Sequence, residues 1–145
     1  GSEGCGGQML CIPSGGSRLP LSPDNIAAGE HFLQMEGRSV FKWAVRVVAD
    51  STHDCLAHAG VPMDEINMMI LHQANIRIID SAVSDFAIER DKIFVNLDRY
   101  GNTSAASIPL ALDEALTSGQ LKAGQRVLLS GFGAGLAWGT AVVQL

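Results

Sequence analysis

The longest periodic pattern of hydrophobic residues begins at Ser39 and ends at Gly60. Apolar side chains recur there at spacings of three and four positions, from Val40 to Leu56, which is the period of a helix with one buried face. Gly60 is followed shortly by Pro62, and both residue types are common just beyond helix C-termini. The pattern therefore predicts one long amphipathic helix.

Shorter patterns predict the other elements. A continuous apolar run at 67–71 is typical of a strand buried on both faces. The glycine-rich start of the chain holds one short apolar run that we also expect to be a strand. Strands that alternate with helices indicate an α/β fold with a mixed sheet. The remaining predictions are a strand at 8–12, helices at 76–87 and 104–116, an extended piece at 93–95, and closing strands at 126–130 and 136–145.

Composition and charge narrow the class of protein. The 145 residues are 47% hydrophobic and 17% charged, as in a globular domain with a sizeable core. The net charge is −5 and no basic run occurs, which argues against a nucleic-acid partner. No apolar stretch is long enough to span a bilayer, and the first residues do not have the pattern of a signal peptide. We therefore expect a soluble, cytoplasmic protein with no membrane partner.

Cysteine usage predicts neither disulfides nor a metal site. Cys5, Cys11 and Cys55 are an odd set without CxxC spacing, so reduced thiols are the simplest expectation. Cys55 falls on the apolar stripe of the long helix, where a free cysteine usually serves as a small buried hydrophobe.

A histidine follows the buried strand directly, in the segment His-Gln-Ala-Asn at 72–75. Ligands in open α/β sheets bind beyond the carboxyl ends of strands, so His72 is a candidate catalytic residue. The alternative is a histidine satisfied by structural contacts, which is more common for a histidine taken at random.

Two further segments contain candidate chemistry. At 101–107, a residue such as Asn102 could cap the next helix, or its amide could act with a neutral histidine to stabilise an oxygen that becomes negative. At 131–139, four glycines follow a strand, but a second strand follows, and this excludes the dinucleotide fingerprint. That segment is either a plain hairpin turn or a place where backbone N–H groups face a ligand.

The three segments together, in this order, resemble the C-terminal half of the 3-oxoacyl-acyl-carrier-protein synthase III family. These are the condensing enzymes that start type II fatty acid synthesis. The resemblance implies an α/β, thiolase-like fold in which residues 1–145 form a C-terminal half-domain, with a loop-rich first segment at 1–36. It also implies a homodimer, substrates that are an acyl-CoA and malonyl-acyl-carrier protein, and no cofactor or metal.

The resemblance also implies roles for particular residues. His72 and Asn102 match the histidine and asparagine of a Cys-His-Asn triad, which stabilise the enolate formed from the malonyl thioester. Ala134, through its backbone N–H, and the adjacent Gly133 match a second oxyanion site, and Phe132 matches an aromatic residue beside the departing carboxylate. The family's cysteine begins a helix in the N-terminal half, which is absent here, and none of the three cysteines matches it.

A row of basic residues marks a possible docking face. Arg38, Lys42 and Arg46 recur at intervals of four, on one face of the long helix. The alternative is an ordinary solvated face. The resemblance favours docking of the acidic carrier protein on these residues and Arg77, because the family's basic surface includes positions that match Lys42 and Arg77. This chain departs from some members of the family, which have further basic residues where it has Ser84 and Asp85. Two other functions also stay open, namely a non-catalytic carrier-binding subunit and a relative that transfers acyl groups to another nucleophile.

Overall fold

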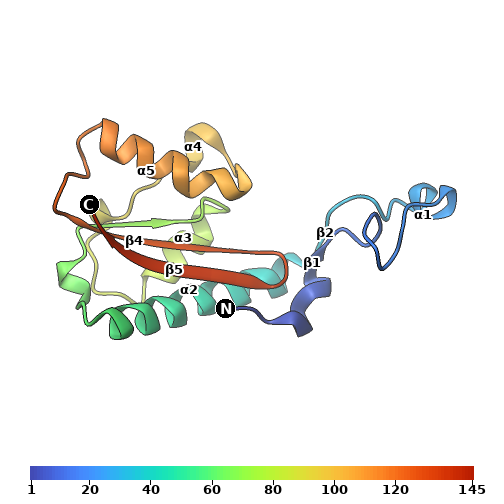
Figure 1. Cartoon of the computed structure of the whole chain (residues 1–145), viewed down its shortest axis with the longest axis horizontal. Coiled ribbons are helices and arrows are strands. Elements are labelled where there is room, and N and C mark those ends of the chain that lie inside the picture. The colour runs from blue at the N-terminus through green and yellow to red at the C-terminus, as the bar shows by residue number, and fades with distance from the viewer. The chain divides into compact units, whose positions relative to one another are not determined.

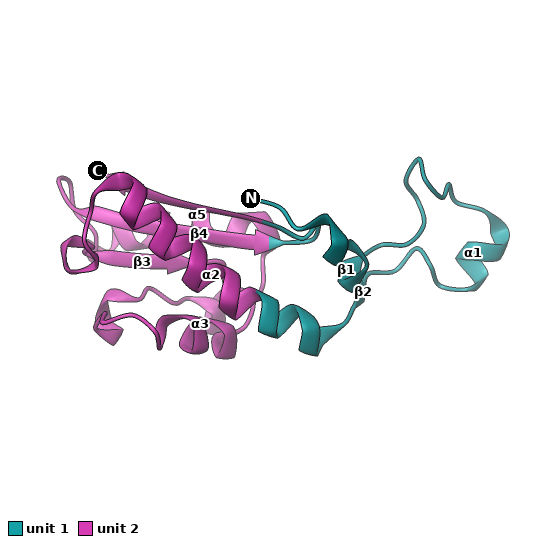
Figure 2. Ribbon diagram, turned by 90° about the horizontal axis from the view of Figure 1, so that it is seen from below, with its two compact units in different colours: residues 1–43, 133–137 teal, residues 44–132, 138–145 magenta.

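The computed structural model describes all 145 residues. They form two compact units: residues 1–43 with 133–137, and residues 44–132 with 138–145 (Figure 2). The helices are α1 (Pro23–Ala27), α2 (Gly37–Ala59), α3 (Ile76–Val83), α4 (Leu97–Tyr100) and α5 (Ser107–Thr117). The strands are β1 (Leu10–Cys11), β2 (Gln34–Met35), β3 (Met68–Leu71), β4 (Arg126–Gly133) and β5 (Ala137–Gln144). Short 3₁₀ turns occupy Gly4–Met9, Met63–Glu65, Arg90–Lys92 and Ser104–Ala106.

The second unit is built on a three-stranded sheet in the order β3-β4-β5 (Figure 1). β3 and β4 are parallel, with Met68 opposite Val127 and Leu71 opposite Ser130. Every residue of β3 is buried, because side chains on both faces of this strand are covered. The strand predicted at 67–71 is therefore confirmed, as are the closing strands, although β4 extends three residues further than predicted.

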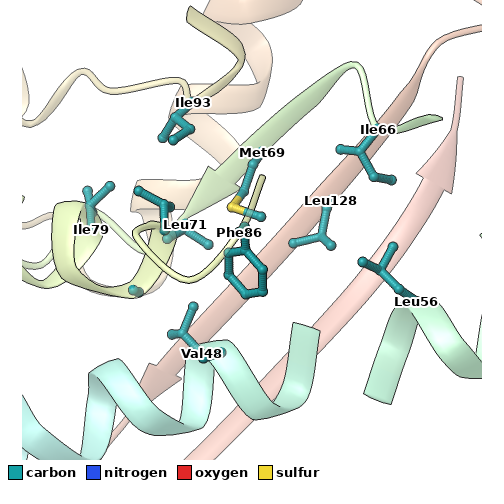
Figure 3. Packing of buried hydrophobic residues seen from close by; sticks show 12 residues of the cluster. Val48, Leu56, Ile66, Met69, Leu71, Ile79, Phe86, Ile93 and Leu128 are labelled. Atoms are coloured by element: carbon teal, nitrogen blue, oxygen red, sulfur yellow. The ribbon is translucent and has the colours of Figure 1, made fainter. Parts of the chain in front are cut away.

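Alternate residues of the strands pack into two separate cores. Met69, Leu71 and Leu128 contact side chains of α2 and α3, such as Val48 and Ile79 (Figure 3). Met68, Ile70 and Val127 instead pack with Phe94 and with Ala111 and Ala115 of α5. Within this unit the sheet therefore lies between helices on both faces, which is the layered α/β arrangement that the alternation of elements predicts.

The long helix is confirmed almost to the residue, since α2 covers Gly37–Ala59. Its apolar stripe is buried, with Ala44 at 0% and Val48 at 1% exposure. Gly60 follows with a φ of +64°, the left-handed conformation that ends many helices. Cys55 is only half-buried on this helix, whereas its place on the apolar stripe predicted a buried side chain.

The first unit is mostly irregular. The strand predicted at 8–12 is wrong for most of its length, because Gly4–Met9 form a 3₁₀ turn and only the two residues of β1 pair with β2. Ser22 and Asn25 hydrogen-bond reciprocally in a capping box that begins α1. Several apolar side chains of this unit are exposed, Phe32 at 64% and Leu33 at 63% among them.

Three predictions in the second unit also need correction. The helix predicted at 104–116 begins instead at Ser107, after the 3₁₀ turn Ser104–Ala106. The extended piece at 93–95 forms a single parallel bridge, between Ile93 and Met69, and not a strand. The helix predicted at 76–87 ends at Val83, although Phe86 beyond it is still buried in the core.

Candidate functional site

His72 lies directly after the last residue of β3. Its backbone N–H donates to the carbonyl oxygen of Ser130, 2.8 Å away, and this bond continues the β3–β4 ladder by one residue. The imidazole is thus held beyond the carboxyl end of a buried parallel strand, where ligands bind in α/β sheets.

Two side chains contact the imidazole of His72. Its Nδ1 is 2.6 Å from the hydroxyl oxygen of Ser107, the first residue of α5. The ring of Phe132 meets it edge-on, with 5.3 Å between ring centroids. Burial lowers the pKa of His72, because the charged imidazolium loses hydration. Burial therefore favours the neutral ring, in which one nitrogen donates a hydrogen bond while the other accepts.

Gln73 fixes the turn that follows His72. Its buried side-chain amide donates to the carbonyl oxygens of Leu71, at 2.7 Å, and Phe94, at 3.4 Å. Its backbone N–H donates to the hydroxyl of Ser107, 3.2 Å away. The same serine oxygen thus contacts two successive residues of the turn.

A second group of polar contacts extends toward the surface. The side chain of Asn96 donates to a carboxylate oxygen of Glu114, 3.0 Å away, and Arg99 forms an ion pair with the same carboxylate. The hydrogen bond from Asn96 and the adjacent guanidinium hold the pKa of Glu114 below its usual value. We conclude that Asn96 joins a buried turn to a charged pair on the outside of α5.

Asn102 lies in the exposed loop that leads into α5. Its Oδ1 accepts a hydrogen bond from the backbone N–H of Ser104, 2.9 Å away, and this leaves its Nδ2 hydrogens to be donated elsewhere. The capping prediction for this segment is wrong for α5, because the N-cap of α5 is Ala106 and has no side-chain bond. Ser104 adopts a φ of +53°, unusual for a residue other than glycine.

The other predicted site residues fall into two groups. Gly133 ends β4 and Ala134 is exposed in the turn before β5, and both belong to the first unit. The basic residues are exposed, with Arg38, Lys42 and Arg46 on α2 and Arg77 in the first turn of α3. The N-cap of α3 is Asn75, whose Oδ1 accepts from the N–H of Arg77 at 2.9 Å.

Each cysteine has surroundings of its own. Cys5 lies in the 3₁₀ turn Gly4–Met9, which sequence analysis did not predict, and its thiol is 3.9 Å from the Glu3 carboxylate. Cys11 is in β1, and Cys55 is in the interior of α2.

No group of three or more His, Cys, Asp or Glu side chains could hold a metal ion. No helix has both the length and the apolar character needed to cross a membrane.

Sequence reasoning missed Gln73, Asn96 and Ser107 as functional candidates. Gln73 and Ser107 are inside the singled-out segments, but their contact joins positions 34 residues apart, which one sequence without related sequences does not reveal. A signal was present in Gln73, because a polar residue directly after a buried strand must find buried partners.

Comparisons with known proteins identify the family. A family model described as 3-oxoacyl-[acyl-carrier-protein] synthase III C terminal matches residues 56–145. A curated beta-ketoacyl-[acyl-carrier-protein] synthase III from Rhodopirellula baltica is 63% identical over 144 residues, which are 99% of this chain and 42% of the relative. The enzyme of the same name from Symbiobacterium thermophilum is 50% identical, over 99% of this chain and 44% of its own length.

Solved structures agree with this result. The beta-ketoacyl-[acyl carrier protein] synthase III of Thermus thermophilus is 41% identical, with a TM-score of 0.86 over 100% of this chain and 44% of that chain. Another 3-oxoacyl-(acyl-carrier-protein) synthase III is 32% identical, with a TM-score of 0.93 over 100% of this chain and 46% of that chain. The thiolase-like fold predicted from the sequence is confirmed, and the chain spans less than half the length of these relatives. This chain belongs to the 3-oxoacyl-[acyl-carrier-protein] synthase III family, within the part that the C-terminal family model describes.

Proposed function

We propose that this chain is the C-terminal part of an enzyme that condenses an acyl-CoA primer with malonyl-acyl-carrier protein. The reaction is a decarboxylative Claisen condensation and starts fatty acid synthesis. The names of the relatives support this assignment, and so does the position of His72 at the end of β3. The proposal assigns no cofactor or metal to the reaction.

In the proposed reaction, His72 and Asn102 donate hydrogen bonds to the thioester oxygen of the malonyl group. The carboxylate leaves as carbon dioxide, and the electron pair of the broken C–C bond forms an enolate whose negative oxygen these two donors stabilise. The enolate carbon then attacks the acyl thioester on a cysteine, a C–C bond forms, and the cysteine leaves as a thiolate. Phe132 would lie beside the carboxylate, and the N–H of Ala134, next to Gly133, would stabilise the second oxyanion.

The observation that carries the proposal is the place of His72, directly beyond β3 and with its imidazole against Phe132. A neutral imidazole donates a hydrogen bond to a developing oxyanion without placing a full charge on the substrate thioester beforehand. Burial lowers the pKa of this histidine, and the ring of Phe132 packs against the imidazole. Both features favour an imidazole that donates while it is uncharged.

The cysteine of this reaction would lie outside these 145 residues. A nucleophilic thiol needs a cation, an imidazole or a helix N-terminus to stabilise its thiolate. Cys5 instead faces the Glu3 carboxylate, and Cys55 is in a helix interior. We therefore assign the nucleophile to an N-terminal half of the same enzyme, in agreement with the 42% of a relative's length that this chain covers.

Two surfaces would contact partners. Arg38 lies in the first turn of α2, where the positive end of the helix dipole adds to its charge, and Lys42 lies in the second turn. With Arg46 and Arg77 they form the proposed docking face for the acidic carrier protein in the cytoplasm. Exposed apolar side chains of the first unit, such as Phe32 and Leu33, would be covered by the N-terminal half or by the second subunit of a homodimer.

The test uses the complete enzyme and follows carbon dioxide release separately from acylation of its cysteine. His72→Ala and Asn102→Ala should each slow decarboxylation by ~10²- to 10³-fold, as for the loss of one oxyanion donor, and should leave most of the cysteine acylation. His58→Ala, an exposed residue of α2, is the matched control and should change neither step. Normal carbon dioxide release in both site variants would contradict the roles assigned to His72 and Asn102. A complete wild-type protein that binds the carrier protein but releases no carbon dioxide would instead favour a non-catalytic carrier-binding subunit.

A further inference from the structure

Ser107 contacts the candidate site from α5 through one buried hydroxyl. Its oxygen is 2.6 Å from Nδ1 of His72 and 3.2 Å from the backbone nitrogen of Gln73, and the residue is only 2% exposed. We propose that Ser107 is a positioning residue that holds the imidazole of His72 with its proton on Nε2.

The direction of the bond follows from counting donors and acceptors. The backbone N–H of Gln73 can only donate, so the Ser107 oxygen accepts from it. The single hydroxyl proton then needs an acceptor, and Nδ1 of His72 is the one within reach. If Nδ1 carried the proton instead, the hydroxyl hydrogen would be buried without an acceptor, which is unfavourable.

Other contacts hold Ser107 and the two residues that its hydroxyl contacts, His72 and Gln73. The backbone of His72 is bonded to Ser130, and the amide of Gln73 is bonded to Leu71 and Phe94. Ser107 is the first residue of α5, so its Cα position is set by the helix. A hydroxyl that is held in place selects one tautomer of His72 more strongly than a mobile hydroxyl would.

The consequence is that Nε2–H is the free donor of His72. Nε2 has no hydrogen-bond partner within the chain, and the imidazole is only partly buried, so this nitrogen can reach a ligand. The opposite tautomer would present a lone pair and would repel a developing oxyanion. The expected effect of the tautomer on the rate of decarboxylation rests on the proposed function. The tautomer itself does not, because it is a property of the free protein.

The first measurement is nuclear magnetic resonance of the complete enzyme with ¹⁵N-labelled histidine, well above pH 6.5. Two-bond correlations between ring protons and nitrogens distinguish Nε2–H from Nδ1–H, and His72→Gln identifies the resonances of His72 by their loss. We expect the Nε2–H form in the wild type, a mixture in Ser107→Ala, and the wild-type form again in Ser107→Thr, which keeps a hydroxyl. Ser118→Ala, a matched loss of a hydroxyl at the end of α5, should leave the tautomer unchanged.

The second measurement is decarboxylation by the same variants. Ser107→Ala should lower the rate roughly 10- to 100-fold, as is common when the partner that orients a functional histidine is removed, and Ser107→Thr should restore most of it. An Nδ1–H tautomer in the wild type, or no change of tautomer in Ser107→Ala, would overturn the inference. If the tautomer responds as expected but His72→Ala releases carbon dioxide normally, the inference stands and the proposed function fails.

Discussion

The side-chain oxygen of Gln73 accepts a hydrogen bond from the backbone N–H of Asn96, 3.2 Å away. Both residues are 1% exposed. Because the same side chain also donates to two carbonyl oxygens, one amide ties the turn after β3 to the segment that follows the bridge at Ile93. The position of His72 therefore depends on a neighbour that makes no contact with the imidazole itself.

Replacing this amide should destabilise the protein. Gln73→Leu keeps the volume but leaves buried backbone groups of Leu71, Phe94 and Asn96 without a partner, and each such group costs about 1–3 kcal/mol. The measurement is the urea midpoint of the complete enzyme. Gln120→Leu, an exposed glutamine whose amide contacts only Ser118, is the control, and an equal loss in both variants would contradict the role of the buried amide.

The stability of the protein should depend on pH through His72. Its pKa in the folded protein is below the ordinary 6.5, so between these two values the unfolded chain binds more protons than the folded one. Stability should therefore fall as the pH drops below about 6.5, and this contribution should be complete above that value. His72→Gln removes the titration and should flatten the decline of the thermal midpoint at acidic pH. Parallel curves for both proteins across the whole range would show that His72 does not contribute.

Substitutions at Gly60 should show how much the left-handed backbone conformation at the end of α2 matters for stability. The φ of Gly60, +64°, is strained for residues with a Cβ, and a Cβ there would meet no atom within 4 Å. Gly60→Ala should therefore cost about 1 kcal/mol from backbone strain alone, whereas Gly60→Asn should cost less because asparagine tolerates this conformation. Chemical denaturation compares the two variants, and an asparagine variant no more stable than the alanine variant would argue against strain.

Charge reversal tests the docking face. Lys42→Glu combined with Arg77→Glu should lower kcat/KM for malonyl-acyl-carrier protein roughly tenfold or more at low salt, since complementary charges speed association, and less at high salt. Activity with malonyl-CoA should change little. Lys122→Glu, an exposed lysine just before β4, is the control, and equal losses with both malonyl donors would indicate damage to the fold.

Labelling tests the assignment of the nucleophile. After incubation of the complete enzyme with radiolabelled acetyl-CoA, digestion and mass spectrometry should find the acetyl group on a peptide outside these 145 residues. Cys5 faces the Glu3 carboxylate, the thiol of Cys11 contacts Gln8, and Cys55 lies inside α2, so none of the three begins an α-helix that would stabilise a thiolate. Stoichiometric label on any of them would place the nucleophile in this chain.

The sequence predicted the elements whose pattern is local. α2 and β3 were found because a helical period and an unbroken apolar run are each visible within a few residues. β1 was misplaced because its partner, Gln34–Met35, lies far along the chain and has no apolar pattern. The start of α5 was set too early because the conformation of Ser104 depends on a hydrogen bond from its own N–H to Asn102, not on its helix propensity.

The candidate site was predictable only in part. His72 stood out because it ends a buried strand, and Phe132 was named by resemblance and does contact the imidazole. The contacts that orient the imidazole join β3, α5 and the turn at Asn96, and such long-range contacts follow from the packing of the sheet against α5. One sequence without related sequences does not contain that information.

The strained backbone at Ser104 has a consequence for evolution. A residue with a Cβ at a φ of +53° holds the loop beside Asn102 at an energetic cost of about 1 kcal/mol or more. Asparagine tolerates that conformation better, so a laboratory selection for heat resistance alone should accumulate Ser104→Asn. A selection that also demands turnover should accept the substitution only if Asn102 keeps its orientation. The two selected populations would then diverge at this position, and sequencing them would show whether the loop has been shaped by stability or by activity.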